Sequence, residues 1–181
     1  PRLEGERVRV VVNVNTGPLC PERRLPLPLM AGLLTGLAAE RPVSYHLTGT
    51  AAEQPAVAEG LRRLPPQVPA VSYAGRLGLA ELLSLRGSAA LVISNDSGPL
   101  HLAAGVGART MSFFGPETPG RFGPLGDGHT VVVGQVPCGP CLTADNLKRA
   151  PCGGRNVCLG QLTPDQLIPL ATRALDGAGG F

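Results

Sequence analysis

The sequence is poor in aromatic residues, in charge and in long apolar runs. Of its 181 residues only 3% are aromatic and none is tryptophan, so the stacking platforms that bind single-stranded nucleic acids are missing. Charged residues make up 16% and the formal net charge is +3, a surplus too small and dispersed for a nucleic-acid surface. No apolar run approaches the ~20 residues of a membrane span. We therefore expect neither nucleic-acid binding nor a transmembrane segment.

Two nucleotide-binding signatures are also missing. No GxGxxG follows the first predicted strand and no GxxxxGK[ST] occurs, so a nicotinamide site and a Walker-type phosphate loop lose their main support. A serine hydrolase built on Ser97 and His101 would lack the nucleophile-elbow sequence. A Mg²⁺ ion that binds phosphate would require two carboxylates at the opening of the site, and the sequence places only Asp96 there.

What the chain does contain is a regular alternation of apolar segments. Alternating strands and helices predict an α/β fold, Rossmann-like and doubly wound, with about six parallel strands in the order 3-2-1-4-5-6 and helices on both faces. One domain, 1–181, would include a Cys-rich loop at 138–158 and a last helix at 164–175. Because the chain begins with Pro1 just before a strand, we expect it to be a piece of a longer protein. The predicted strands are 8–14, 43–48, 70–74, 91–94, 110–114 and 130–133, and the other predicted helices are 27–39, 51–64, 79–85 and 100–106.

Polar residues gather where two of these strands end. Asn15 and Thr16 follow the first strand, and the sequence Asn95-Asp96-Ser97-Gly98-Pro99 follows the fourth. In the predicted order these two turns flank the switch point of the sheet, where ligands bind. Asp96 or Ser97 could cap the helix, which would leave the backbone N–H groups of Ser97 and Gly98 free to hold an anion, with His101 one helical turn further on. The alternative is an ordinary N-cap with a partly buried His101 bonded to a backbone carbonyl.

Two further charged groups could belong to this site. Arg23 and Arg24 follow the first strand and could pair with phosphate and neutralise a leaving group, or they could be solvated loop charges. Glu81, in the third helix, could accept hydrogen bonds from ribose hydroxyls or could be a helix-start charge.

Two motifs together resemble a known family. Asp96-Ser97-Gly98, His101 and the two alanines after it, followed by a strand and Phe114-Gly115-Pro116-Glu117-Thr118-Pro119, are similar to the pattern D-[ST]-G-x-x-H-x-A-A and F-G-P-T-x-P. This pattern is typical of glycosyltransferase family 9, the lipopolysaccharide heptosyltransferases of GT-B architecture. The resemblance covers nearly the whole chain and concerns the C-terminal, nucleotide-sugar-binding domain of these enzymes.

The resemblance implies roles for individual residues. The donor would be a nucleotide sugar, typically ADP-heptose, with Asp96, Ser97, Gly98 and His101 at its diphosphate and sugar, and with Asn15 and Thr16 near the phosphates. Arg23 stands where the family usually has a catalytic Lys, and Leu25 stands where it usually has Trp. Arginine offers a bidentate fork rather than a point charge, so these two departures bear on the identity of the donor and on catalytic strength.

The resemblance also implies what this chain lacks. In the family, the general base and the acceptor site lie in an N-terminal domain, so this chain should bind donor but not transfer sugar alone. The reaction would be inverting transfer of a heptose-like sugar to a lipid-linked acceptor in lipopolysaccharide core or related glycan synthesis, with no cofactor required. The expected location is cytoplasmic, at most peripheral to the inner face of the inner membrane. A non-catalytic nucleotide-sugar-binding module, and half of another GT-B-like enzyme such as a nucleotide-sugar epimerase, are the alternatives.

The five cysteines raise a separate question. Cys138, Cys141, Cys152 and Cys158 have the spacing C-x₂-C-x₁₀-C-x₅-C, and the first pair and the loop between them also resemble several family members. Four thiolates would complete a structural zinc site, although reduced thiols or disulfides fit the same spacing. Cys20 lies apart, near the expected donor site.

Overall fold

The structure, a computed structural model, describes residues 7–17, 20–142 and 149–177. Within them, six parallel strands form one sheet in the order β3-β2-β1-β4-β5-β6, as predicted from the sequence. Its strands are β1 (Val8–Asn13), β2 (Val43–Thr48), β3 (Ala70–Ser72), β4 (Leu91–Asn95), β5 (Thr110–Phe114) and β6 (His129–Val133). The helices are η1 (Pro21–Arg23), α1 (Leu27–Glu40), η2 (Ala51–Glu53), α2 (Gln54–Arg62), α3 (Leu79–Gly87), α4 (Gly98–Gly105), α5 (Pro119–Phe122), α6 (Val157–Gly160) and α7 (Pro164–Leu175).

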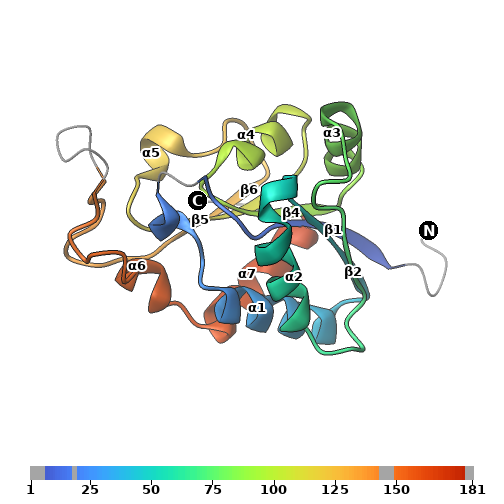
Figure 1. Ribbon diagram of the computed structural model, residues 1–181, viewed down its shortest axis with the longest axis horizontal. Coiled ribbons are helices and arrows are strands. Elements are labelled where there is room, and N and C mark those ends of the chain that lie inside the picture. Colours follow the sequence, from blue (N-terminus) through green and yellow to red (C-terminus); the bar gives the residue numbers. More distant parts are fainter. Residues whose placement is uncertain (1–6, 18–19, 143–148, 178–181) are drawn as a thin grey trace.

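Helices cover both faces of the sheet (Figure 1), with α1, α2 and α7 on one side and α3 and α4 on the other. The first side holds the larger core, because Val10, Val12 and Ile93 pack there with the leucines of α1. The second side holds a small cluster around Val11 and Val92. Consecutive β1 residues thus point to opposite, buried faces, which is why a near-continuous apolar run is required. No described helix has the length and apolar character to cross a bilayer.

The strand order places the functional turns together. β1 lies beside β4 with Val12 opposite Ile93 and Asn13 opposite Ser94, so both strands end at the same edge of the sheet. Crossovers to opposite sides of the sheet begin at this edge, which is the topological switch point. The turns after β1 and β4 are therefore neighbours, although 84 positions separate Asn13 from Ser97, which it contacts after β4.

Some helices differ from the sequence prediction. The predicted helix 51–64 is divided into η2 and α2, because Thr50 and Glu53 form a capping box that starts with a 3-10 turn. The helix after β4 begins at Gly98, two residues earlier than predicted. Thr163 caps α7 as expected, with its hydroxyl oxygen accepting a hydrogen bond from the Gln166 backbone N–H. The four-residue helices α5 and α6 were not predicted.

Arg86, in the last turn of α3, is an unusual member of the interior. Its side chain is only 1% exposed, and burial lowers the pKa of its guanidinium to about 10. Its Nε and Nη1 donors are buried and have no hydrogen-bond partner within the described residues. A buried charge without a partner is destabilising.

We predict that Arg86→Met raises the stability of the domain. The substitution keeps an unbranched side chain of suitable length and removes the desolvation cost of the guanidinium, so the free energy of unfolding should increase by about 1–3 kcal/mol. Urea unfolding followed by circular dichroism would measure the change. Arg62→Met, at an exposed position on α2, is the matched control and should change stability by less than about 0.5 kcal/mol. A less stable Arg86→Met would show that the guanidinium is compensated.

Candidate functional site

A cavity of about 340 Å³ opens at the carboxyl ends of β1 and β4. Its walls come from the turns after these two strands, from η1, from the loop after β2 and from the start of α4. The structure brings seven of the residues considered in the sequence analysis to this cavity, namely Asn15, Thr16, Arg23, Asp96, Ser97, Gly98 and His101, whereas Arg24 and Glu81 do not line it. Their individual roles stay predictions.

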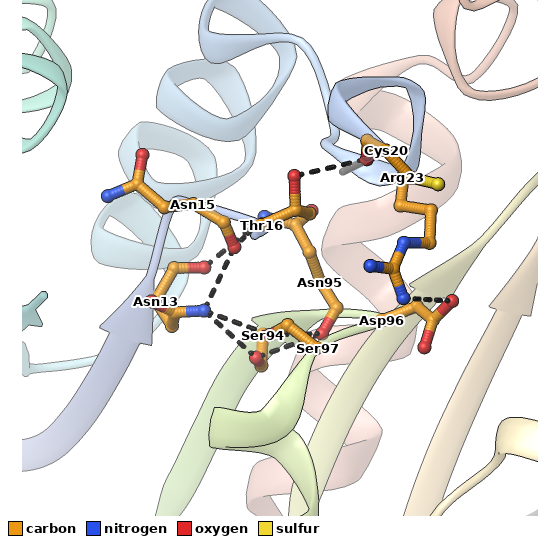
Figure 2. Close-up of polar contacts among 9 residues, drawn as sticks. All are labelled: Asn13, Asn15, Thr16, Cys20, Arg23, Ser94, Asn95, Asp96 and Ser97. Carbon is orange, nitrogen blue, oxygen red and sulfur yellow. Dashed lines mark hydrogen bonds and ion pairs between the residues drawn. The ribbon is translucent and has the colours of Figure 1, made fainter. Parts of the chain in front are cut away.

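A buried asparagine joins the two turns (Figure 2). The Asn13 Nδ2 donates hydrogen bonds to the carbonyl oxygen of Asn15 at 3.0 Å, to Ser97 Oγ at 3.2 Å and to Ser94 Oγ at 3.4 Å. The Ser97 hydroxyl in turn donates to the carbonyl oxygen of Asn95 at 3.2 Å. Ser97 is therefore held within the protein by both of its hydrogen bonds. The hydrogen bonds of the Ser97 hydroxyl hold this part of the cavity wall in position. The Ser97 backbone lies at the start of α4.

A second asparagine, Asn95, fastens the segment that carries Arg23. Its Oδ1 accepts a hydrogen bond from the Leu25 backbone N–H at 2.8 Å, and its Nδ2 donates to the carbonyl oxygens of Asn13 and Asn15. Thr16 Oγ1 donates to the carbonyl oxygen of Cys20 at 3.3 Å. Because these bonds link β4, the turn after β1 and the segment around η1, the position of Arg23 depends on the carboxyl end of β4.

Arg23 and Asp96 form an ion pair at the wall of the cavity. Their Nη1 and Oδ2 atoms are 3.5 Å apart, and Asp96 is only 3% exposed. Burial raises the pKa of the Asp96 carboxyl group, Arg23 opposes that change, and the negative charge of Glu117 adds to it. The net direction is upward, so the pairing at this distance does not compensate fully for the loss of water.

The start of α4 is open to the cavity. Ser97 occupies the N-cap position, but no side chain caps the helix, so the expectation that Asp96 or Ser97 would cap it is wrong. Asp96 is paired with Arg23 and Ser97 with Asn13. Gly98 is exposed, and a Cβ added there would meet no atom within 4 Å. The first-turn N–H groups of α4 are therefore at a surface where an anion can approach.

Two buried donors at the site are without a partner. Asn15 is 4% exposed, and its Nδ2 has no hydrogen-bond partner within residues 7–17, 20–142 and 149–177. The same holds for the Nε of Arg23. Buried donors are nearly always hydrogen-bonded in native proteins, so each exception calls for an explanation. Both residues line the cavity, so a ligand rich in acceptor oxygens would accept hydrogen bonds from these two donors.

The cavity also contains residues that the sequence analysis did not nominate. Thr50, Glu53 and Phe122 line it. Glu53 Oε2 accepts hydrogen bonds from the backbone N–H and the hydroxyl of Thr50, which sets the carboxylate at the rim after β2. The sequence feature that could have identified Glu53 is its position as an acidic residue shortly after the second predicted strand. Glu81 does not reach this cavity, and its Oε2 accepts a hydrogen bond from the Gly78 backbone N–H at the start of α3.

The four cysteines near the C-terminus are not arranged as metal ligands in the part of the chain that the structure describes. None of them is in a disulfide, and the described residues contain no group of three or more His, Cys, Asp or Glu placed to hold a metal ion. Burial raises the pKa of the Cys158 thiol, and burial together with neighbouring thiols raises that of Cys141, whereas backbone N–H groups lower the pKa of Cys152. The structure therefore gives no support for zinc on Cys138, Cys141, Cys152 and Cys158.

The fold and the site together define a class. The chain is a Rossmann-like α/β domain with a cavity at its topological switch point. A family model, glycosyltransferase family 9 (heptosyltransferase), matches residues 34–150. The chain belongs to this family, and the expectation from the two motifs is confirmed.

Relatives agree with this assignment. A lipooligosaccharide heptosyltransferase 2 from Haemophilus influenzae is 33% identical over 88 residues, 48% of this chain and 25% of that protein. A lipopolysaccharide heptosyltransferase 1 from Pseudomonas aeruginosa is 35% identical over 104 residues, 57% of this chain and 28% of that protein. The matched stretch thus spans about a quarter of these relatives' length. The structure of E. coli ADP-heptose LPS heptosyltransferase II shares the fold, with a TM-score of 0.77 and 23% identity over 96% of this chain and 48% of that one.

Proposed function

We propose that this chain is the part of a heptosyltransferase that binds the nucleotide-sugar donor, and that its cavity holds the donor diphosphate. The observation that supports the proposal best is the convergence of unused donors on one cavity. Arg23, the Asn15 Nδ2 and the uncapped first turn of α4 all meet there. A diphosphate supplies the negative charge and the acceptor oxygens that these groups need.

The nucleoside would lie toward β2. Glu53 stands at the rim of the cavity after this strand, where Rossmann-like proteins often use a carboxylate to bind ribose hydroxyls. ADP is the proposed nucleotide and a heptose the proposed sugar. Two heptosyltransferases that share the fold have been solved with such ligands, E. coli WaaC with ADP and TibC with ADP-D-β-D-heptose, at 21% and 13% identity to this chain.

The proposed reaction is transfer of the sugar with inversion to a lipid-linked acceptor. An acceptor hydroxyl oxygen forms the new bond to the anomeric carbon, the bond from that carbon to the diphosphate oxygen breaks, and the electron pair leaves with the diphosphate. Arg23 and the start of α4 would stabilise the departing charge. The acceptor proton passes to a general base, which we place, with the acceptor site, in a domain outside these residues. The chain alone should therefore bind donor without transferring sugar.

Gly98 gives a direct test of the binding site. A methyl group at this position would point into open space in the protein but would occupy the approach of a phosphate to the α4 backbone. We predict that Gly98→Ala weakens binding of ADP-glucose, used as an ADP-sugar probe, by at least about tenfold, while the melting temperature is unchanged or slightly higher. Isothermal titration calorimetry and thermal unfolding would measure the two quantities.

Gly105→Ala is the matched control for this experiment. Gly105 ends the same helix, is exposed, and a Cβ added there also meets no atom within 4 Å. This variant should bind ADP-glucose as the original chain does. Equal binding by Gly98→Ala and Gly105→Ala would contradict the proposed placement of the diphosphate. A panel with UDP-glucose and GDP-mannose would establish which nucleotide is preferred.

A further inference from the structure

The cavity at the switch point extends along the sheet edge past four neighbouring strands. Thr50 and Glu53 line it after β2, Asn15 after β1, Gly98 after β4, and Phe122 in α5, which follows β5. In the sheet these strands have the order β2-β1-β4-β5, and α2 and α5 are well separated (Figure 1). Because neighbouring strands are about 4.8 Å apart, the four strands cover roughly 14 Å of the edge. Such a site suits an elongated ligand, with Glu53 at one end and Phe122 at the other.

Phe122 gives its end of the cavity an aromatic residue. The chain has four phenylalanines, and Phe113 and Phe114 are fully buried in the interior. Phe122, by contrast, is half-buried and lines the cavity. Aromatic side chains are common in the walls of small-molecule sites, where they contribute apolar contact area to the ligand. The α5 end therefore differs in chemistry from the centre of the cavity, which is polar and charged.

The short helix α5 holds Phe122 in position. The Phe122 backbone N–H donates a hydrogen bond to the carbonyl oxygen of Thr118 at 3.1 Å, and the Gly123 N–H donates to the carbonyl oxygen of Pro119 at 2.7 Å. The guanidinium carbon of Arg121 lies 5.3 Å from the centroid of the Phe122 ring, which is within the range of a cation–π contact. The ring is thus attached to an ordered turn before a ligand binds.

The proposed function determines which part of the donor reaches Phe122. It places the ribose at Glu53, after β2, and the diphosphate at Arg23 and the first turn of α4, after β1 and β4. A sugar nucleotide has its nucleoside, diphosphate and sugar in a line, so the sugar extends in the remaining direction, toward α5. A sugar ring has hydroxyl groups at its rim and C–H groups on its faces. The negative face of an aromatic ring attracts the weakly positive C–H groups.

We propose that Phe122 determines selectivity for a sugar nucleotide over the bare nucleotide, by packing its ring against the C–H face of the transferred sugar. Phe122 lies beyond the second family motif, which ends at Pro119, so no motif nominated it. Its contact is made with the sugar and not with the nucleotide, and it therefore adds to the affinity for the complete donor alone. The inference rests on the proposed function.

Calorimetric titration with ADP and with ADP-glucose would test the proposal. Phe122→Ala should weaken binding of ADP-glucose by about fivefold to tenfold, the contribution of an aromatic contact, and should change the affinity for ADP by less than about twofold. Glu53→Gln should weaken both ligands by the same factor, because both carry the ribose. Leu125→Ala, at a position that is 88% exposed and outside the cavity, is the matched control and should change neither affinity.

The outcomes of this titration are distinct. Equal weakening of ADP and ADP-glucose by Phe122→Ala would overturn the inference, and so would an unchanged affinity for both ligands. Phe122→Leu keeps apolar bulk without a planar ring and should recover only part of the affinity for ADP-glucose. Failure of the original chain to bind either ligand would overturn the proposed function, and the inference with it.

An NMR measurement on the original chain keeps the inference testable if Phe122→Ala does not fold. Because only 3% of the residues are aromatic, few aromatic signals need to be assigned. We expect nuclear Overhauser effects between the Phe122 ring protons and the glucosyl protons of bound ADP-glucose. Effects to the adenine or ribose protons instead would mean that the donor lies in the reverse direction and would overturn the inference. Bound ADP-glucose without any effect to the Phe122 ring would overturn it as well.

Discussion

Replacing Arg23 with alanine should weaken binding of ADP-glucose by about 10- to 100-fold. Hydrogen bonds to charged groups contribute about 1.5–3 kcal/mol each, which corresponds to this range of affinity. The guanidinium is already directed at the cavity, since Asn95 fixes the following segment through the Leu25 N–H and Nη1 lies 3.5 Å from Asp96 Oδ2. Removing Arg23 also leaves Asp96 without its cation, which opposes the binding of an anion further.

Two variants sharpen the Arg23 prediction. Arg24→Ala removes a neighbouring charge that does not line the cavity and should change affinity by less than about threefold, since a partly solvated charge outside the site contributes little. Arg23→Lys keeps the charge but not the planar fork, so it should recover part of the affinity. Calorimetry at one ionic strength would compare the three variants. If Arg23→Ala and Arg24→Ala had equal effects, Arg23 would act only through the general field of the protein.

The strands could be predicted from the sequence because a strand buried on both faces must be apolar almost throughout. The predicted strands at 8–14 and 91–94 match β1 and β4 to within one residue. Short helices gave no such signal. The helix α6 has four residues, follows Asn156 in a left-handed conformation at φ 50°, and shows no amphipathic period. Its conformation depends on tertiary contacts that no local pattern encodes.

The site could be located from the sequence but not assembled from it. The residues that face the cavity were nominated because their turns follow strands that lie side by side in the predicted order. The hydrogen bonds of Asn13 and Asn95 were not foreseen, since they join residues up to 84 positions apart. The ion pair between Arg23 and Asp96 likewise forms only when the turns after β1 and β4 meet. Composition can predict which groups are present, whereas their electrostatic coupling requires the fold.

The close contact between β6 and α6 leads to the largest expected effect on stability. Gly134 follows β6, and its backbone N–H donates a hydrogen bond to the carbonyl oxygen of Phe114 at 2.8 Å. A Cβ built on Gly134 would overlap the carbonyl group of Cys158. Because the obstacle is backbone, no change of rotamer can relieve it. We predict that Gly134→Ala lowers the free energy of unfolding by about 2–4 kcal/mol, measured by urea denaturation.

The same substitution should also weaken donor binding, since α6 is linked to the site. Asn156 Nδ2 donates a hydrogen bond to the carbonyl oxygen of Arg24 at 2.6 Å, so a displaced α6 would move the segment that carries Arg23. Gly160→Ala, in the same helix but with no atom within 4 Å of the added Cβ, is the control and should keep both stability and binding. A stable Gly134→Ala would show that α6 can move away from β6, and unchanged ADP-glucose binding by that variant would show that Arg23 is positioned by Asn95 alone.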